Sequence, residues 1–90
     1  MPSVKRIVLD VLKPHHPNAL DLAIAIASLA PDYHVSLTIT AVDEKTESAE
    51  VIIESEAVDY VAINVVIGTM GGTIHSIDEV EVAGSPVDPF

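Results

Sequence analysis

Apolar and polar residues alternate along four stretches of the chain, and this period of two is typical of β-strands. Residues 4–12 (VKRIVLDVL) contain the first stretch. Residues 34–55 contain two more, separated by the turn-forming sequence EKTES, and therefore predict a hairpin. Residues 73–82 (TIHSIDEVEV) predict the last strand.

Two other segments carry apolar residues at the spacing of an α-helix. Residues 19–30 follow Asn18, a favourable N-cap, and stop before a proline. Residues 57–70 precede Gly71 and Gly72, and glycine adopts the left-handed conformation that ends a helix at little cost. The residues of the second helix that we expect to face the core are Ile63, Val66, Ile67 and Met70.

The order of these elements, β-α-β-β-α-β, has a preferred solution. Two right-handed split β-α-β units interleave into a four-stranded antiparallel sheet, with strand order 4-1-3-2 and both helices on one face. The pattern therefore predicts an α+β, ferredoxin-like fold. We expect residues 1–82 to form this single domain and residues 83–90 to be a C-terminal tail, because AGSPVDPF is too rich in proline to pair with a strand.

The second helix leaves its outer face without charge, and the first offers only Asp21, Ser28 and the N-cap. From Asp59 to Asp78 no Asp, Glu, Lys or Arg intervenes, although a helix that covers a sheet normally shows water a polar stripe. Exposed aliphatic side chains here would form a contiguous patch of the kind that monomeric proteins avoid. The residues expected on this outward side are Leu20, Ile24, Tyr60, Val61, Asn64, Val65 and Gly68.

Three interpretations of this apolar face stay open. It is a natural subunit interface, or an interface engineered onto a natural scaffold, or ordinary core whose helical phase is misjudged. The first two interpretations predict that the face binds protein, either a copy of the same chain or a second natural or designed component.

The net charge of −10, from 14 acidic and 4 basic residues, limits the partners of the chain. No basic stripe exists to bind nucleic acid, and the charge opposes anionic membrane surfaces. It suits cations, cationic partners, or solubility in the salty cytoplasm of a halophile. The chain has no cysteine, and residues 1–20 lack the pattern of a signal peptide, so we expect a cytoplasmic protein.

Potential metal ligands gather where the end of the first strand meets the start of the last. In the predicted sheet His15 and His16 approach His75, while Asp10 approaches residues 76–78. Carboxylates suit calcium and imidazoles suit transition metals, although the spacing matches no metal motif. Solvated loop histidines beside a charged strand are the alternative. The candidate ligands are Asp10, His15, His75, Asp78 and Glu79.

The first and last strands raise two further points. Arg6 is expected to pair with Glu81 across the two strands. Strict alternation places Ile77 opposite the other apolar residues of the last strand, and a β-bulge near Ser76 would resolve this. Ser76 follows His75 directly, so the two side chains point to opposite faces and form no catalytic pair. We therefore do not expect an enzyme that works by a nucleophile–base pair.

Three segments together resemble one archaeal family, domain of unknown function 211: RIVLDVLKPHHP (6–17), DEKTE (43–47) and GGTIHSIDEVEVAG (71–84). The resemblance implies a ferredoxin-like fold, assembly into symmetric rings, no established activity, and calcium at acidic positions. The acidic balance is similar to that of halophilic members. The chain departs from the family in its second helix, where members carry several charged residues, and this departure favours the engineered interface.

These observations lead to two main functional hypotheses, and an enzyme that needs a metal is a third. The first is a homo-oligomeric assembly or binding domain, ring-like or cage-like, that uses the apolar helix faces or an edge of the sheet. The alternative is a regulatory domain that binds a small ligand or a calcium-type cation between subunits.

Overall fold

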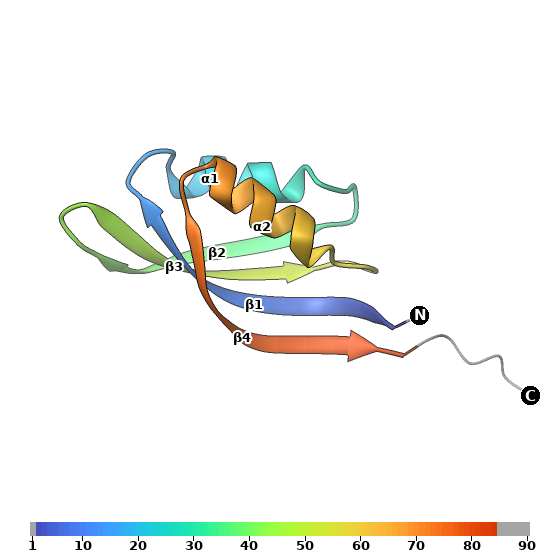
Figure 1. Cartoon of the computed structure of the whole chain (residues 1–90). Helices are drawn as coiled ribbons and strands as arrows, with labels where there is room; N and C mark the ends of the chain where they lie inside the picture. Colours follow the sequence, from blue (N-terminus) through green and yellow to red (C-terminus); the bar gives the residue numbers. More distant parts are fainter. Residues whose placement is uncertain (1, 85–90) are drawn as a thin grey trace, which may run out of the picture.

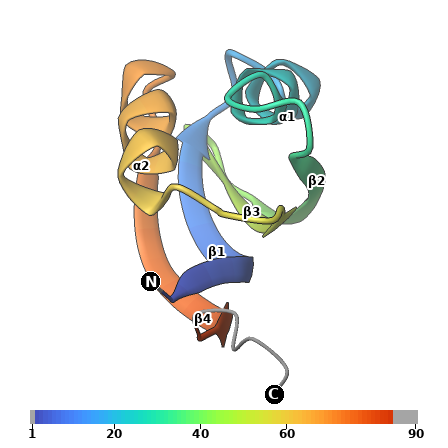
Figure 2. The same cartoon turned by 90° about the vertical axis from the view of Figure 1, so that its right-hand side faces the viewer.

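The structure, a computed structural model, describes residues 2–84. Four antiparallel strands form one sheet in the order β2-β3-β1-β4, with both helices packed on one face (Figures 1 and 2). The prediction of a ferredoxin-like α+β fold is confirmed, because this order is 4-1-3-2 counted from the opposite edge. The elements are β1 (Ser3–Pro14), α1 (Ala19–Ala27), β2 (His34–Val42), β3 (Thr46–Glu54), α2 (Tyr60–Thr69) and β4 (Thr73–Ala83).

The core lies between the helices and the two central strands, β1 and β3. Alternation along β1 sends every second side chain toward the helices, and each helix contributes two fully buried residues at helical spacing. All of these core side chains are aliphatic, as the scarcity of aromatic residues requires. The largest fully buried side chains are Leu9, Val11, Leu22, Ile26, Val51, Ile53, Ile63 and Ile67.

Capping residues mark the start of α1 and the end of α2. The side chain of Asn18 accepts a hydrogen bond of 2.9 Å from the backbone N–H of Asp21, as expected for an N-cap. Helix α1 ends at Ala27 rather than Ala30, although Leu29 still packs against the core. Helix α2 is terminated by Gly71, whose positive φ of 85° confirms the predicted glycine stop.

Two extra residues in β4 settle the conflict in its apolar pattern. The pairing with β1 skips Asp78 and His75, so the two residues that flank each skipped residue pair with consecutive residues of β1 and point to opposite faces. The predicted irregularity near Ser76 is therefore confirmed. As a result, all four large apolar residues of the strand share the helix-side face: Ile74, Ile77, Val80 and Val82.

The N-terminal end of β1 and the C-terminal end of β4 curve away from the helices (Figures 1 and 2). The C-terminal half of β4 is consequently uncovered, and Ile77, Val80 and Val82 stay about half exposed. Strand β4 includes Ala83, and the rest of the predicted tail lies outside the described residues apart from Gly84. Neither helix within residues 2–84 is long and apolar enough to cross a membrane.

Candidate functional site

The outward sides of α1 and α2 both expose aliphatic side chains. Leu20 and Ile24 are 67% and 54% exposed, and Val61 and Val65 are 71% and 61% exposed. The two helices lie side by side over the sheet (Figure 2). We call the surface made by these four side chains the outer helix face. Its large exposed fractions exclude the interpretation that these residues are core with a misjudged phase.

The other residues predicted for this surface divide into two kinds. Asn64 and Gly68 are exposed on α2 beside the outer helix face. Tyr60 does not belong there, because its ring is half-buried and packs against the core. Its outward placement was therefore wrong. The helix begins at Tyr60, capped by the Asp59 side chain, and this phase turns the first side chain toward the sheet.

The sheet face without helices carries acidic side chains around one arginine. Arg6 donates to Glu79 at 2.8 Å and lies 3.3 Å from a carboxylate oxygen of Glu54, so it joins β4 to β3. The prediction of an Arg6–Glu81 ion pair was wrong about the carboxylate. Glu81 is the register partner of Arg6, but the long side chain reaches the diagonal neighbour Glu79 instead.

The candidate metal ligands come together only in part. Nδ1 of His75 lies 3.4 Å from a carboxylate oxygen of Asp10, and Ser76 donates to Asp78 at 2.7 Å. Glu79 is engaged by Arg6, and His15 makes its contacts elsewhere. Within residues 2–84 no group of three or more His, Asp or Glu side chains is arranged to hold a metal ion.

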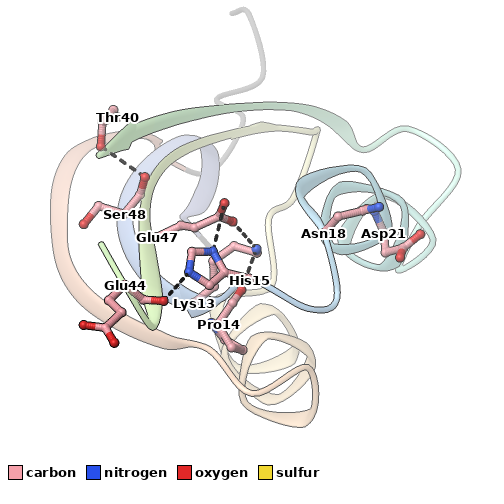
Figure 3. Close-up of polar contacts among 9 residues, drawn as sticks. All are labelled: Lys13, Pro14, His15, Asn18, Asp21, Thr40, Glu44, Glu47 and Ser48. Atoms are coloured by element: carbon pink, nitrogen blue, oxygen red, sulfur yellow. Dashed lines mark hydrogen bonds and ion pairs between the residues drawn. The ribbon is translucent and has the colours of Figure 1, made fainter. Parts of the chain in front are cut away.

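A buried ionic cluster lies at the end of β1, where the sequence pattern predicted only a loop (Figure 3). Nζ of Lys13 donates to Oε1 of Glu47 at 2.7 Å and to the carbonyl of Pro14 at 2.8 Å. The lysine side chain is only 3% exposed, and the glutamate is 19% exposed. The Lys13 bond, more than any other contact, lowers the pKa of Glu47 below its ordinary value.

His15 completes this cluster from the loop that leads to α1. Its Nε2 lies 3.0 Å from the carbonyl oxygen of Glu44, and its Nδ1 lies 3.4 Å from Oε2 of Glu47. The Glu44 carbonyl and then the Glu47 carboxylate raise the pKa of His15 above its ordinary value.

The signal for the cluster was present in the sequence. Lys13 continues the alternation of Ile7, Leu9 and Val11, so a strand that runs on to Pro14 must point this lysine inward. A buried lysine then needs an anion, and the register partner of Lys13 is Glu47. The prediction missed this pair because it ended the first strand at Leu12 and assigned Glu47 to a turn.

Comparison with known proteins places the chain in a family. The family model of DUF211, described as "Uncharacterized ArCR", matches residues 5–88. The chain is also 45% identical over 87 residues to the uncharacterized protein MJ0319 of Methanocaldococcus jannaschii, an alignment that covers 97% of this chain and 89% of that protein. The range matched by the family model reaches every helix and strand described above, and the chain therefore belongs to the archaeal DUF211 family.

Proposed function

We propose that the protein is a homo-oligomeric assembly domain whose copies bind one another through the outer helix face. The observation that carries the proposal is the exposure of four aliphatic side chains, each 54–71% exposed, on two adjacent helices. Burying the exposed part of such a side chain stabilises a contact by on the order of 1 kcal/mol. Ring-like or cage-like closure would repeat this contact around a symmetry axis.

The distribution of charge favours a second copy of the chain as the occupant. Each copy carries −10, so two copies repel wherever acidic surfaces meet. The sheet face without helices holds Glu50, Glu54 and Glu79, and it is a poor place for self-contact. The outer helix face has acidic residues only at its rim, Asp21 and Asp59, where the helices begin. Self-association there buries apolar area at the lowest electrostatic cost.

The experiment is light scattering on a sizing column with a double variant, Val61→Glu with Val65→Glu. We expect the natural chain to run as a closed oligomer and the double variant to run as smaller species, because the substitution would bury carboxylates against apolar side chains. Val82→Glu is the matched control, since this valine of β4 is also 52% exposed but lies away from the helices. A monomeric natural chain, or an oligomer unchanged by the double variant, contradicts the proposal.

The edge of the sheet offers a second candidate contact for assembly. Strand β2 pairs only with β3 in the described part of the chain, and it contains no Asp, Glu, Lys or Arg. Natural sheets usually protect such an edge with charge or proline. Thr38→Lys adds a charge to this edge opposite Glu50 of the same chain. If Thr38→Lys dissociates the oligomer and the helix variant does not, the edge is the interface.

The cation-sensor hypothesis is tested separately, because Asp10 and His75 are in contact across β1 and β4. A cation that binds the folded state raises the melting temperature by mass action. We would heat the protein with and without calcium, beside the variant Asp10→Asn. A calcium-dependent rise that Asp10→Asn removes would favour the sensor. An equal melting temperature in all samples would reject it.

A further inference from the structure

We propose that His15 is a pH-sensitive tie between the loop that enters α1 and the turn of the β2–β3 hairpin. When both ring nitrogens carry a proton, the ring can donate a hydrogen bond to Glu44 and another to Glu47, and we call the tie closed. When one proton is lost, one of these two hydrogen bonds is lost and the tie is weakened. This inference concerns a different part of the molecule from the outer helix face, and it does not depend on assembly.

The geometry around the imidazole carries the proposal. Nε2 faces the carbonyl oxygen of Glu44 at 3.0 Å, and Nδ1 faces Oε2 of Glu47 at 3.4 Å (Figure 3). A carbonyl and an ionised carboxylate can only accept hydrogen bonds. A neutral imidazole has one N–H, so it satisfies one of these oxygens and turns a lone pair toward the other. Only the doubly protonated ring donates to both.

Other hydrogen bonds also hold the partners of His15 in place. Lys13 holds the other carboxylate oxygen of Glu47 at 2.7 Å, and this lysine is itself buried and bonded to the Pro14 carbonyl. The Glu44 carbonyl belongs to a tight turn in which the N–H of Asp43 donates to the carbonyl of Thr46 at 2.8 Å. The ring therefore meets two oxygens whose positions are set by other bonds.

The acceptor groups that face the ring favour its cationic form, and burial opposes it. Glu47 of β3 favours the cationic ring, and so do the backbone carbonyls of Glu44 and Asp43 in the turn. Lys13 of β1 is the nearby cation, and it shares the Glu47 carboxylate with the ring. The balance raises the pKa of His15, with the Glu44 carbonyl as the largest cause. The cluster of one carboxylate between two cations thus carries net positive charge while the tie is closed.

The direction of the pH effect follows from this raised value. A group whose pKa is higher in the folded state stabilises the fold fully below its unfolded pKa, about 6.5 for histidine. That stability is lost as the pH rises through the folded pKa. The loop residues 15–18 and the turn residues 43–46 should therefore be held together below the folded pKa of His15 and released as the pH rises through it.

The first test is a proton NMR titration of the folded chain, with the His15 ring signals identified by their loss in His15→Gln. We expect a His15 midpoint above the ordinary value, together with greater hydrogen-exchange protection of the turn amides below that midpoint than above it. A midpoint at or below the ordinary histidine value would falsify the proposal. This measurement needs no variant to fold except the one used for assignment.

The second test compares urea unfolding of the natural chain, His15→Gln and His16→Gln between about pH 5.5 and about pH 8.5, a range that brackets the ordinary histidine pKa, at one protein concentration. His16 is the matched control, because it is the neighbouring, exposed histidine of the same loop. We expect the advantage of the natural chain over His15→Gln to shrink as the pH rises, while His16→Gln follows the natural chain. A difference that is constant with pH, or that grows with pH, overturns the tie.

Discussion

At the scale of single residues, the end of α2 depends on Gly71. Its φ of 85° is unfavourable for any residue with a Cβ, and a Cβ there would lie 3.3 Å from the Pro14 ring. We expect Gly71→Ala to lower the free energy of unfolding by about 1–2 kcal/mol, measured by urea denaturation. Gly84→Ala is the control, because a methyl group added at Gly84 would meet no atom of residues 2–84 within 4 Å and little change should result. Equal losses in both variants would show that the left-handed stop is not the cause.

Arg6 is a second residue on which stability depends, and it lies on the face of the sheet that carries no helix. It lies between Glu54 of β3 and Glu79 of β4, so Arg6→Ala leaves a carboxylate on either side of β1 without their shared cation. We expect a lower melting temperature in low salt and a smaller loss in high salt, because salt screens the repulsion that remains. Lys45→Ala removes the same charge from the exposed turn and should have a much smaller effect. A loss that is the same in both salts would contradict the electrostatic cause.

At the scale of elements, the start of α1 depends on Asn18. Its side chain accepts from the Asp21 N–H at 2.9 Å and so satisfies one of the free donors at the helix start. We expect Asn18→Ala to lower the free energy of unfolding by about 1 kcal/mol, measured by urea denaturation. Asn18→Asp should retain stability, because a carboxylate also accepts this bond and suits the helix dipole. A loss of stability in Asn18→Asp equal to that in Asn18→Ala would reject the capping role.

The elements also show what could be read from the sequence and what could not. Order, topology and the core-facing side of each helix followed from periodicity, because a slipped register or rotated helix would expose Leu9 or Ile63 to water. The Lys13–Glu47 pair was missed because the length of a strand beyond its last apolar residue is set by tertiary pairing, which local pattern does not contain. The position of each skipped residue in β4 likewise depends on the partner strand.

At the scale of the whole molecule, the acidic surface opposes the association of copies of the chain, whereas the outer helix face favours it. The charge of −10 drives copies apart over a distance set by the salt concentration, whereas burial of the outer helix face acts only at contact. The Debye length falls from about 30 Å at 0.01 M salt to about 3 Å at 1 M. Added salt therefore weakens the repulsion and leaves the apolar contact in place.

This balance gives a prediction that separates the apolar interface from one built on ion pairs. We expect the mean mass by light scattering to rise, or the dissociation constant to fall, as salt increases from about 0.01 M to about 1 M. The double variant Val61→Glu with Val65→Glu should stay small at both salt concentrations, because its added carboxylates remain costly to bury when long-range repulsion is screened. An oligomer that dissociates on addition of salt would instead be held by ion pairs. The acidic sheet face around Arg6 would then be the candidate interface.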